Sequence, residues 1–143
     1  MRRRKIKKNW RKFWKLGQEE FNTEFFDVNK DGELVVMEGN YVYNLDNLTK
    51  KYGSPLEVVF PFILEHRLSD LLDYFRAFMK IQGYKGKFLY HYPMKVNQNK
   101  EFVLPLISEG AHMEVGSVNE RWLVKKLWVG KKFNSKLRVL CNG

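Results

Sequence analysis

The 143-residue sequence has a single cysteine, Cys141, so it cannot form an internal disulfide bond. One thiol also excludes cysteine-rich zinc sites, and such low cysteine usage is typical of a reducing compartment. No apolar run approaches the roughly 20 residues that a membrane-spanning helix needs. The basic start is not followed by the apolar core of a signal peptide, so we expect a cytoplasmic protein.

Acidic residues are missing from the first 15 positions, which hold nine of the 26 Lys and Arg residues. The rest of the chain has 17 basic and 16 acidic residues, so the net charge of +10 arises mainly from an N-terminal segment, residues 1–17. A basic adaptor that binds nucleic acid is one hypothesis. We favour a solvated tail, with neither nucleic acid nor a membrane as partner.

Asp27, Asn29, Asp31, Gly32 and Glu38 match the spacing of an EF-hand calcium loop. A small calcium-binding module over Asp27–Glu38 is therefore an alternative function. An EF-hand loop must lead into a helix, whereas residues 33–37 and 41–43 have the composition of strands. We therefore expect residues 27–32 to form an Asx-type turn that enters a β-hairpin, within a small β-rich extension at 18–54.

Apolar residues recur every three or four positions after Pro61, from Leu64 to Met79, and Gly83 follows. This pattern predicts a helix whose Leu/Phe face lies in the core. A shorter helix is predicted over 45–51. A strand is predicted over 56–60, between Pro55 and Pro61.

Strand and helix patterns alternate from Phe88 to the end of the sequence. Strands are predicted over 88–96, 111–115 and 137–141, and helices over 99–108 and 119–128. Corresponding strand positions lie 24 and 25 residues apart, which is long enough for one helical crossover between parallel strands. A (β/α)8 barrel takes about 250 residues. We therefore expect an α/β fold in which residues 55–143 are the first βα units of an incomplete TIM-like barrel, from a longer or split protein.

Functional residues of such barrels lie where strands end and βα loops begin. This rule selects Lys95 and Asn97, Glu114 and Ser117, and Cys141 and Asn142 as candidates. Partial desolvation at the mouth of a barrel would favour a neutral lysine amine, which can form an imine with a carbonyl compound or with pyridoxal phosphate. An ordinary loop lysine remains the alternative.

Residues 92–98, Tyr-Pro-Met-Lys-Val-Asn-Gln, resemble the pyridoxal-phosphate lysine motif of biosynthetic arginine decarboxylases, which belong to the alanine-racemase-like group. The resemblance extends from about Trp14 to the last residue. It is carried by Phe60-Pro61, Ile63-Leu64, His66-Arg67-Leu68, Gly83-Tyr84, Glu114-Val115-Gly116-Ser117, Asn119-Glu120 and Cys141-Asn142-Gly143. Phe26-Asp27-Val28-Asn29 with Gly32 also resembles that family's N-terminal segment, which accounts for the calcium-loop spacing.

The resemblance implies an N-terminal portion of a decarboxylase that converts L-arginine to agmatine and CO2 in polyamine biosynthesis. Lys95 would form the Schiff base with pyridoxal 5'-phosphate, and Glu114 would support the cofactor. Mg2+ is implied by the resemblance alone. A related decarboxylase acting on diaminopimelate or ornithine would share the lysine.

The same resemblance implies that the phosphate grip and the groups that recognise arginine come from elsewhere. Their sources would be the remainder of the barrel, a C-terminal β domain or a partner in a homo-oligomer. We therefore expect no decarboxylation of arginine by this chain alone.

Overall fold

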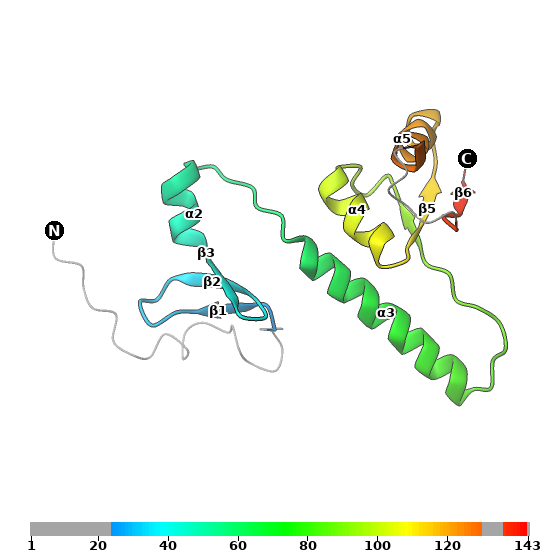
Figure 1. Cartoon of the computed structure of the whole chain (residues 1–143), viewed down its shortest axis with the longest axis horizontal. Coiled ribbons are helices and arrows are strands. Elements are labelled where there is room, and N and C mark those ends of the chain that lie inside the picture. Colours follow the sequence, from blue (N-terminus) through cyan, green and yellow to red (C-terminus); the bar gives the residue numbers. More distant parts are fainter. Residues whose placement is uncertain (1–23, 130–135, 143) are drawn as a thin grey trace. The chain divides into compact units, whose positions relative to one another are not determined.

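The computed structural model describes residues 24–129 and 136–142 (Figure 1). The basic segment predicted at 1–17 lies outside these residues. The chain divides into two compact units, residues 1–58 and 59–143. Each unit is described by itself.

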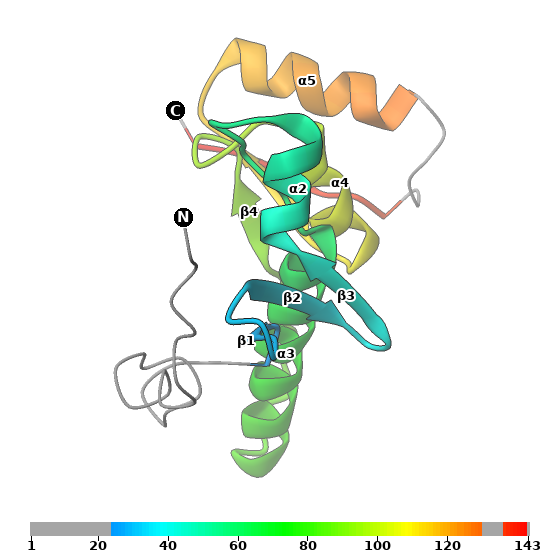
Figure 2. The same ribbon diagram turned by 90° about the vertical axis from the view of Figure 1, so that its left-hand side faces the viewer.

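The first unit contains an antiparallel sheet in the order β1-β2-β3, and Figure 2 shows β2 in the middle. Its elements are β1 (Phe26–Val28), β2 (Leu34–Glu38), β3 (Tyr41–Asn44) and α2 (Leu45–Tyr52). Val36 at the centre of β2 is fully buried, and Phe25 and Val35 are also buried. The predicted hairpin and the short helix are confirmed, and β1 adds a third strand that the sequence analysis did not predict.

The segment over 56–60, predicted as a strand, forms none in the structure. Phe60 keeps an extended backbone but is the residue before α3 (Pro61–Ile81), with Pro61 in the first turn of that helix. Apolar, β-branched composition is thus not sufficient for a strand here, because a strand also requires a partner for its backbone hydrogen bonds.

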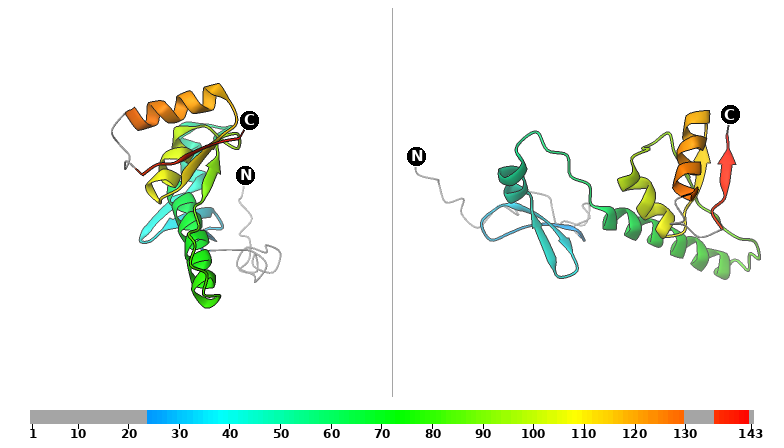
Figure 3. Two further views of the ribbon diagram at one scale, coloured as in Figure 1. Left: turned by 90° about the vertical axis from the view of Figure 1, so that its right-hand side faces the viewer. Right: turned by 45° about the horizontal axis from the view of Figure 1, so that its top comes forward.

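The second unit has a parallel sheet in the order β4-β5-β6. Its strands are β4 (His91–Pro93), β5 (His112–Val115) and β6 (Val139–Cys141). Helix α4 (Lys100–Ser108) connects the first two strands, and α5 (Val118–Val129) follows the second. Figure 3 shows β5 and β6 side by side, next to α5. The predicted alternation of parallel strands and helices is confirmed, whereas closure into an eight-stranded barrel remains a prediction.

Strand β4 is shorter than the predicted 88–96 and ends at Pro93, which has no N–H to donate but is tolerated because β4 is an edge strand in the described sheet. Only one further bond follows, from the Met94 amide to the Glu114 carbonyl oxygen at 2.9 Å, before the chain turns. The strand therefore delivers Lys95 to a turn immediately beyond the sheet.

Side chains alternate between the two faces of the parallel sheet. On one face Tyr92, Met94, Met113 and Val115 are buried among residues of the helices. The buried helix and loop residues of this core are Leu68, Val103, Leu106, Ile107, Ala111 and Val124. The other face carries His91, Pro93, His112 and Glu114, all only half-buried. Helices thus cover one face, and the more polar face remains accessible.

Candidate functional site

The candidate site is the edge of the parallel sheet at which all three strands end. Lys95 lies two residues after β4, Glu114 is the penultimate residue of β5, and Asn142 directly follows β6. In parallel α/β sheets, ligands bind outside the carboxyl ends of the strands. The structure therefore brings three residues selected from the sequence to the edge where chemistry is expected.

Glu114 and Asn142 are in direct contact. The Asn142 Nδ2 donates to Glu114 Oε1 at 2.9 Å, and the Asn142 backbone N–H donates to the Val115 carbonyl oxygen at 2.8 Å. The carboxylate of Glu114 is thus held by the neighbouring strand. Among the described residues, no hydrogen-bond donor contacts its second oxygen, Oε2.

Lys95 is exposed, next to the fully buried Met94. The described residues therefore do not desolvate its amine, contrary to the expectation for a closed barrel mouth. Its turn is nonetheless fixed, because the Tyr92 hydroxyl donates to the Asn97 carbonyl oxygen at 3.1 Å and the Asn99 N–H donates to Asn97 Oδ1 at 2.9 Å. Burial raises the pKa of the Tyr92 phenol, so this hydroxyl remains a donor at neutral pH.

The other candidates are placed as follows. Asn97 shapes the Lys95 turn, Ser117 accepts a hydrogen bond from the Glu120 N–H at 3.2 Å, and Cys141 is exposed at the end of β6. His91 is half-buried, with Nδ1 3.2 Å from the Leu89 carbonyl oxygen, which is the environment of a packed, hydrogen-bonded histidine.

Sequence reasoning missed Glu120 as a residue of this edge. Its carboxylate is buried and accepts hydrogen bonds from Gly116 and Gln98. A signal was present, because Ser117 and Glu120 have the Ser-x-x-Glu spacing of a capping box at the start of a helix.

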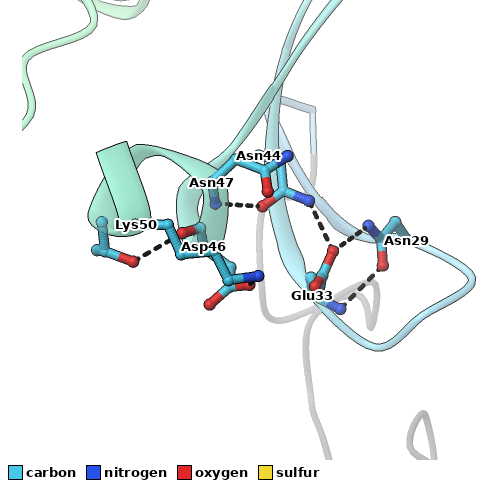
Figure 4. A network of polar contacts seen from close by, with 7 residues as sticks. Asn29, Glu33, Asn44, Asp46, Asn47 and Lys50 are labelled. Atoms are coloured by element: carbon cyan, nitrogen blue, oxygen red, sulfur yellow. Dashed lines mark hydrogen bonds and ion pairs between the residues drawn. The ribbon is translucent and has the colours of Figure 1, made fainter. Parts of the chain in front are cut away.

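The predicted calcium loop has a different structure. Asn29 Oδ1 accepts from the Asp31 and Glu33 backbone N–H groups, which is the predicted Asx turn, centred on Asn29. Figure 4 shows Asn29 and Asn44 both donating to Glu33 Oε2, at 3.0 and 2.7 Å. Glu38, the expected bidentate ligand, lies in a strand and accepts from the Tyr43 hydroxyl at 2.7 Å, a bond that raises the pKa of Tyr43. This geometry argues against the calcium module.

Among residues 24–129 and 136–142, no group of three or more His, Cys, Asp or Glu side chains is placed to hold a metal ion. The Mg2+ implied by the resemblance therefore remains a prediction. Within the same residues, no helix is both long and apolar enough to cross a membrane.

The second unit is thus a parallel α/β structure with the Lys95 amine and the Glu114 carboxylate at the ends of adjacent strands. Comparison with curated proteins shows relatives named biosynthetic arginine decarboxylase. That of Neisseria meningitidis is 34% identical over 131 residues, which cover 83% of this chain and 20% of the relative. Those of Phocaeicola vulgatus and Shewanella frigidimarina are 29% and 30% identical over 134 and 135 residues.

The resemblance predicted from the sequence is therefore confirmed: this chain is a relative of the biosynthetic arginine decarboxylases. It spans about a fifth of the length of the curated relatives it matches. No protein-family model matches the chain.

Proposed function

We propose that this chain is the N-terminal portion of a pyridoxal-phosphate-dependent arginine decarboxylase of polyamine biosynthesis. In this proposal β4, β5 and β6 are the first strands of a (β/α)8 barrel, and Lys95 holds the cofactor. The main support for this proposal is that Lys95, Glu114 and Asn142 lie at one edge of a parallel sheet. The chain is also related to proteins named biosynthetic arginine decarboxylase.

The side chains at this edge fit the reactive end of pyridoxal phosphate. Lys95 offers an exposed primary amine, the group that condenses with an aldehyde, on a turn fixed by Tyr92 and Asn97. Glu114 offers a carboxylate oriented by Asn142 on the next strand. When bound, the cofactor supplies an electron sink for the bond to the departing carboxylate of an amino acid.

The chain's own residues would perform three tasks in this reaction. The exposed Lys95 amine would hold the cofactor. Glu114 acts as an anionic acceptor near the cofactor. The helix-covered core beneath the sheet keeps these two strand ends fixed relative to each other. Recognition of arginine, and completion of the barrel and an oligomer, belong to the rest of the proposed protein.

The first test asks whether Lys95 is the preferred amine. The 143-residue chain is incubated with pyridoxal phosphate, reduced with borohydride and digested, and the pyridoxyl group is located by mass spectrometry. We expect labelling mainly at Lys95 and its loss in Lys95→Arg. Lys100→Arg serves as control, because Lys100 is another exposed lysine nearby in sequence. Equal labelling of Lys95 and Lys100 would contradict the proposal.

The second test concerns the activity and the substrate. This chain replaces the matched fifth of the Neisseria meningitidis relative, and the chimera is assayed with arginine, ornithine and diaminopimelate. We expect agmatine from arginine, no activity in the Lys95→Arg chimera, and no agmatine from the 143-residue chain alone. An inactive but folded chimera, or preference for another substrate, would refute the assignment.

A further inference from the structure

Glu120 is the buried charged side chain among the described residues, with 7% of its surface exposed. Burial of a carboxylate is costly unless its oxygens accept hydrogen bonds. Glu120 lies in the first turn of α5, where the helix dipole also favours a negative charge. A capping role explains why Glu120 lies at the start of α5. It does not explain why the second carboxylate oxygen of Glu120 also has a hydrogen-bond partner.

The two oxygens of Glu120 accept from two different βα loops. Oε2 accepts from the Gly116 backbone N–H at 2.7 Å, in the loop that follows β5. Oε1 accepts from Gln98 Nε2 at 3.2 Å, in the loop that follows β4. The carboxylate therefore joins consecutive βα units through residues 22 positions apart in the sequence.

Each of these loops carries part of the candidate site. Gln98 lies three residues after Lys95, and Gly116 lies two residues after Glu114. The loop after β5 also lies close to the end of β6, because a Cβ added to Gly116 would lie 3.3 Å from the Asn142 carbonyl oxygen. The Lys95 turn is thus fixed at its start by the Met94–Glu114 backbone bond and at its end by Glu120.

We infer that Glu120 is a positioning residue that sets the location of Lys95 relative to Glu114 and Asn142. It acts through Gln98 and Gly116 and does not itself reach the cofactor. This inference rests on the proposed function for its chemical meaning. The bridge between the loops is a feature of the chain that can be tested on its own.

The test separates positioning from capping by changing Gln98. Gln98→Met keeps the length of the side chain and removes the donor to Glu120, while the Gly116 and Ser117 contacts of the helix start remain. Gln82→Met is the matched control, since Gln82 follows α3 and is exposed. Glu120→Gln is the conservative partner variant, because an amide can still bond to Gly116 and to a rotated Gln98 amide.

Three measurements are made on the 143-residue chain. They are the ratio of pyridoxyl labelling at Lys95 to that at Lys100, the exchange rates of amide hydrogens at 95–99, and the denaturant midpoint. Gln98 is exposed and its bond to Glu120 is 3.2 Å long, so its loss should loosen the loop without unfolding the chain. We therefore expect Gln98→Met to lower the labelling ratio about fivefold and to accelerate exchange at 95–99, with little change in the midpoint. Gln82→Met should change none of these, and Glu120→Gln should retain most of the ratio.

Failure of this inference can be told apart from failure of the proposed function. An unchanged ratio and unchanged exchange in Gln98→Met, with Lys95 still the preferred lysine, would overturn the positioning role alone. If the wild-type chain shows no preference for Lys95, the proposed function fails, and faster exchange at 95–99 in Gln98→Met would still support the bridge. A large loss of stability in Gln98→Met would show a merely structural role.

Discussion

Asn142 donates to Glu114 across the ends of two parallel strands, with 2.9 Å between Nδ2 and Oε1. Asn142→Asp keeps the shape of the side chain and replaces the donor with a carboxylate. At pH 7 this pair of like charges should lower the free energy of unfolding by about 1 kcal/mol. Near pH 4 one carboxyl can be protonated and donate, so the loss should shrink. Denaturant titrations at the two pH values measure this.

The control for that prediction is Asn99→Asp. Asn99 precedes α4 and makes no side-chain capping bond. An anionic side chain at a helix N-terminus is favourable, so this variant should gain stability at pH 7 and lose that gain in acid. The same pH trend in both variants would contradict the assigned Asn142–Glu114 contact.

Val103 tests the core beneath the sheet. It is fully buried on α4, whereas Val118 at the start of α5 is 72% exposed. Val103→Ala should cost about 2 kcal/mol of unfolding free energy through lost burial and a residual cavity. Val118→Ala makes the same chemical change and should stay within about 0.5 kcal/mol of wild type. Equal effects in urea titrations would show that the core is assigned wrongly.

Asn29 is predicted to hold the turn between β1 and β2. Asn29→Ala removes the acceptor of two backbone N–H groups and a donor to Glu33. The expected cost to the first unit is about 1–2 kcal/mol. This loss of stability should appear as faster exchange of the backbone amide hydrogen of Val36, which is fully buried in β2. Lys30→Ala, an exposed change in the same turn, should leave exchange at Val36 unaltered.

Calcium should not bind at residues 27–38. The side-chain oxygens of Asn29, Glu33 and Glu38 already accept hydrogen bonds within the sheet and its turn. Calorimetry with calcium should therefore show no saturable heat. Micromolar binding that disappears in Asp27→Ala would revive the calcium-module hypothesis.

His112 should make stability depend on pH. Burial, and then the neighbouring His91 and Arg138, hold the pKa of His112 below its ordinary value of 6.5. Its Nδ1 also accepts from the Arg138 backbone N–H at 3.2 Å, which requires an unprotonated nitrogen. As pH falls through 6.5 the unfolded chain takes up this proton before the folded chain does, so stability decreases with acidification.

The comparison that isolates this effect uses two variants. His112→Asn can accept a bond near the Nδ1 position but cannot be protonated, so part of the stability loss between pH 7.5 and 5 should vanish. Gln82→Asn, an exposed change at the end of α3 that involves no titratable group, should keep the wild-type profile. Thermal unfolding across this pH range provides the measurement, and identical profiles for wild type and His112→Asn would refute the prediction.

The periodicity of α3 predicted its helix and part of its buried face. Leu68 is buried, and Leu64, Leu71 and Leu72 pack against the core. Phe75 and Phe78 continue the same stripe but are 42% and 62% exposed. Figure 1 shows α4 beside the first part of α3 only. Periodicity identifies a face of a helix, but it does not say how far the covering element extends.

The sequence was sufficient to predict those residues of the candidate site that lie at the ends of strands. The rule for parallel sheets selected Lys95, Glu114 and Asn142 from local patterns, and the structure places all three at one edge. Glu120 could not be found in this way, since its pattern is that of a helix cap. Its bond to Gln98 depends on how two units pack, and local periodicity does not carry that information.

The carboxylate shared by two loops means that neighbouring units of this sheet cannot diverge independently. A replacement at position 98 that cannot donate would remove one of the two hydrogen bonds of the buried Glu120 carboxylate, and with it the link between the two loops. Among homologous sequences positions 98 and 120 should therefore covary, so that a substitution at one position is accompanied by a substitution at the other.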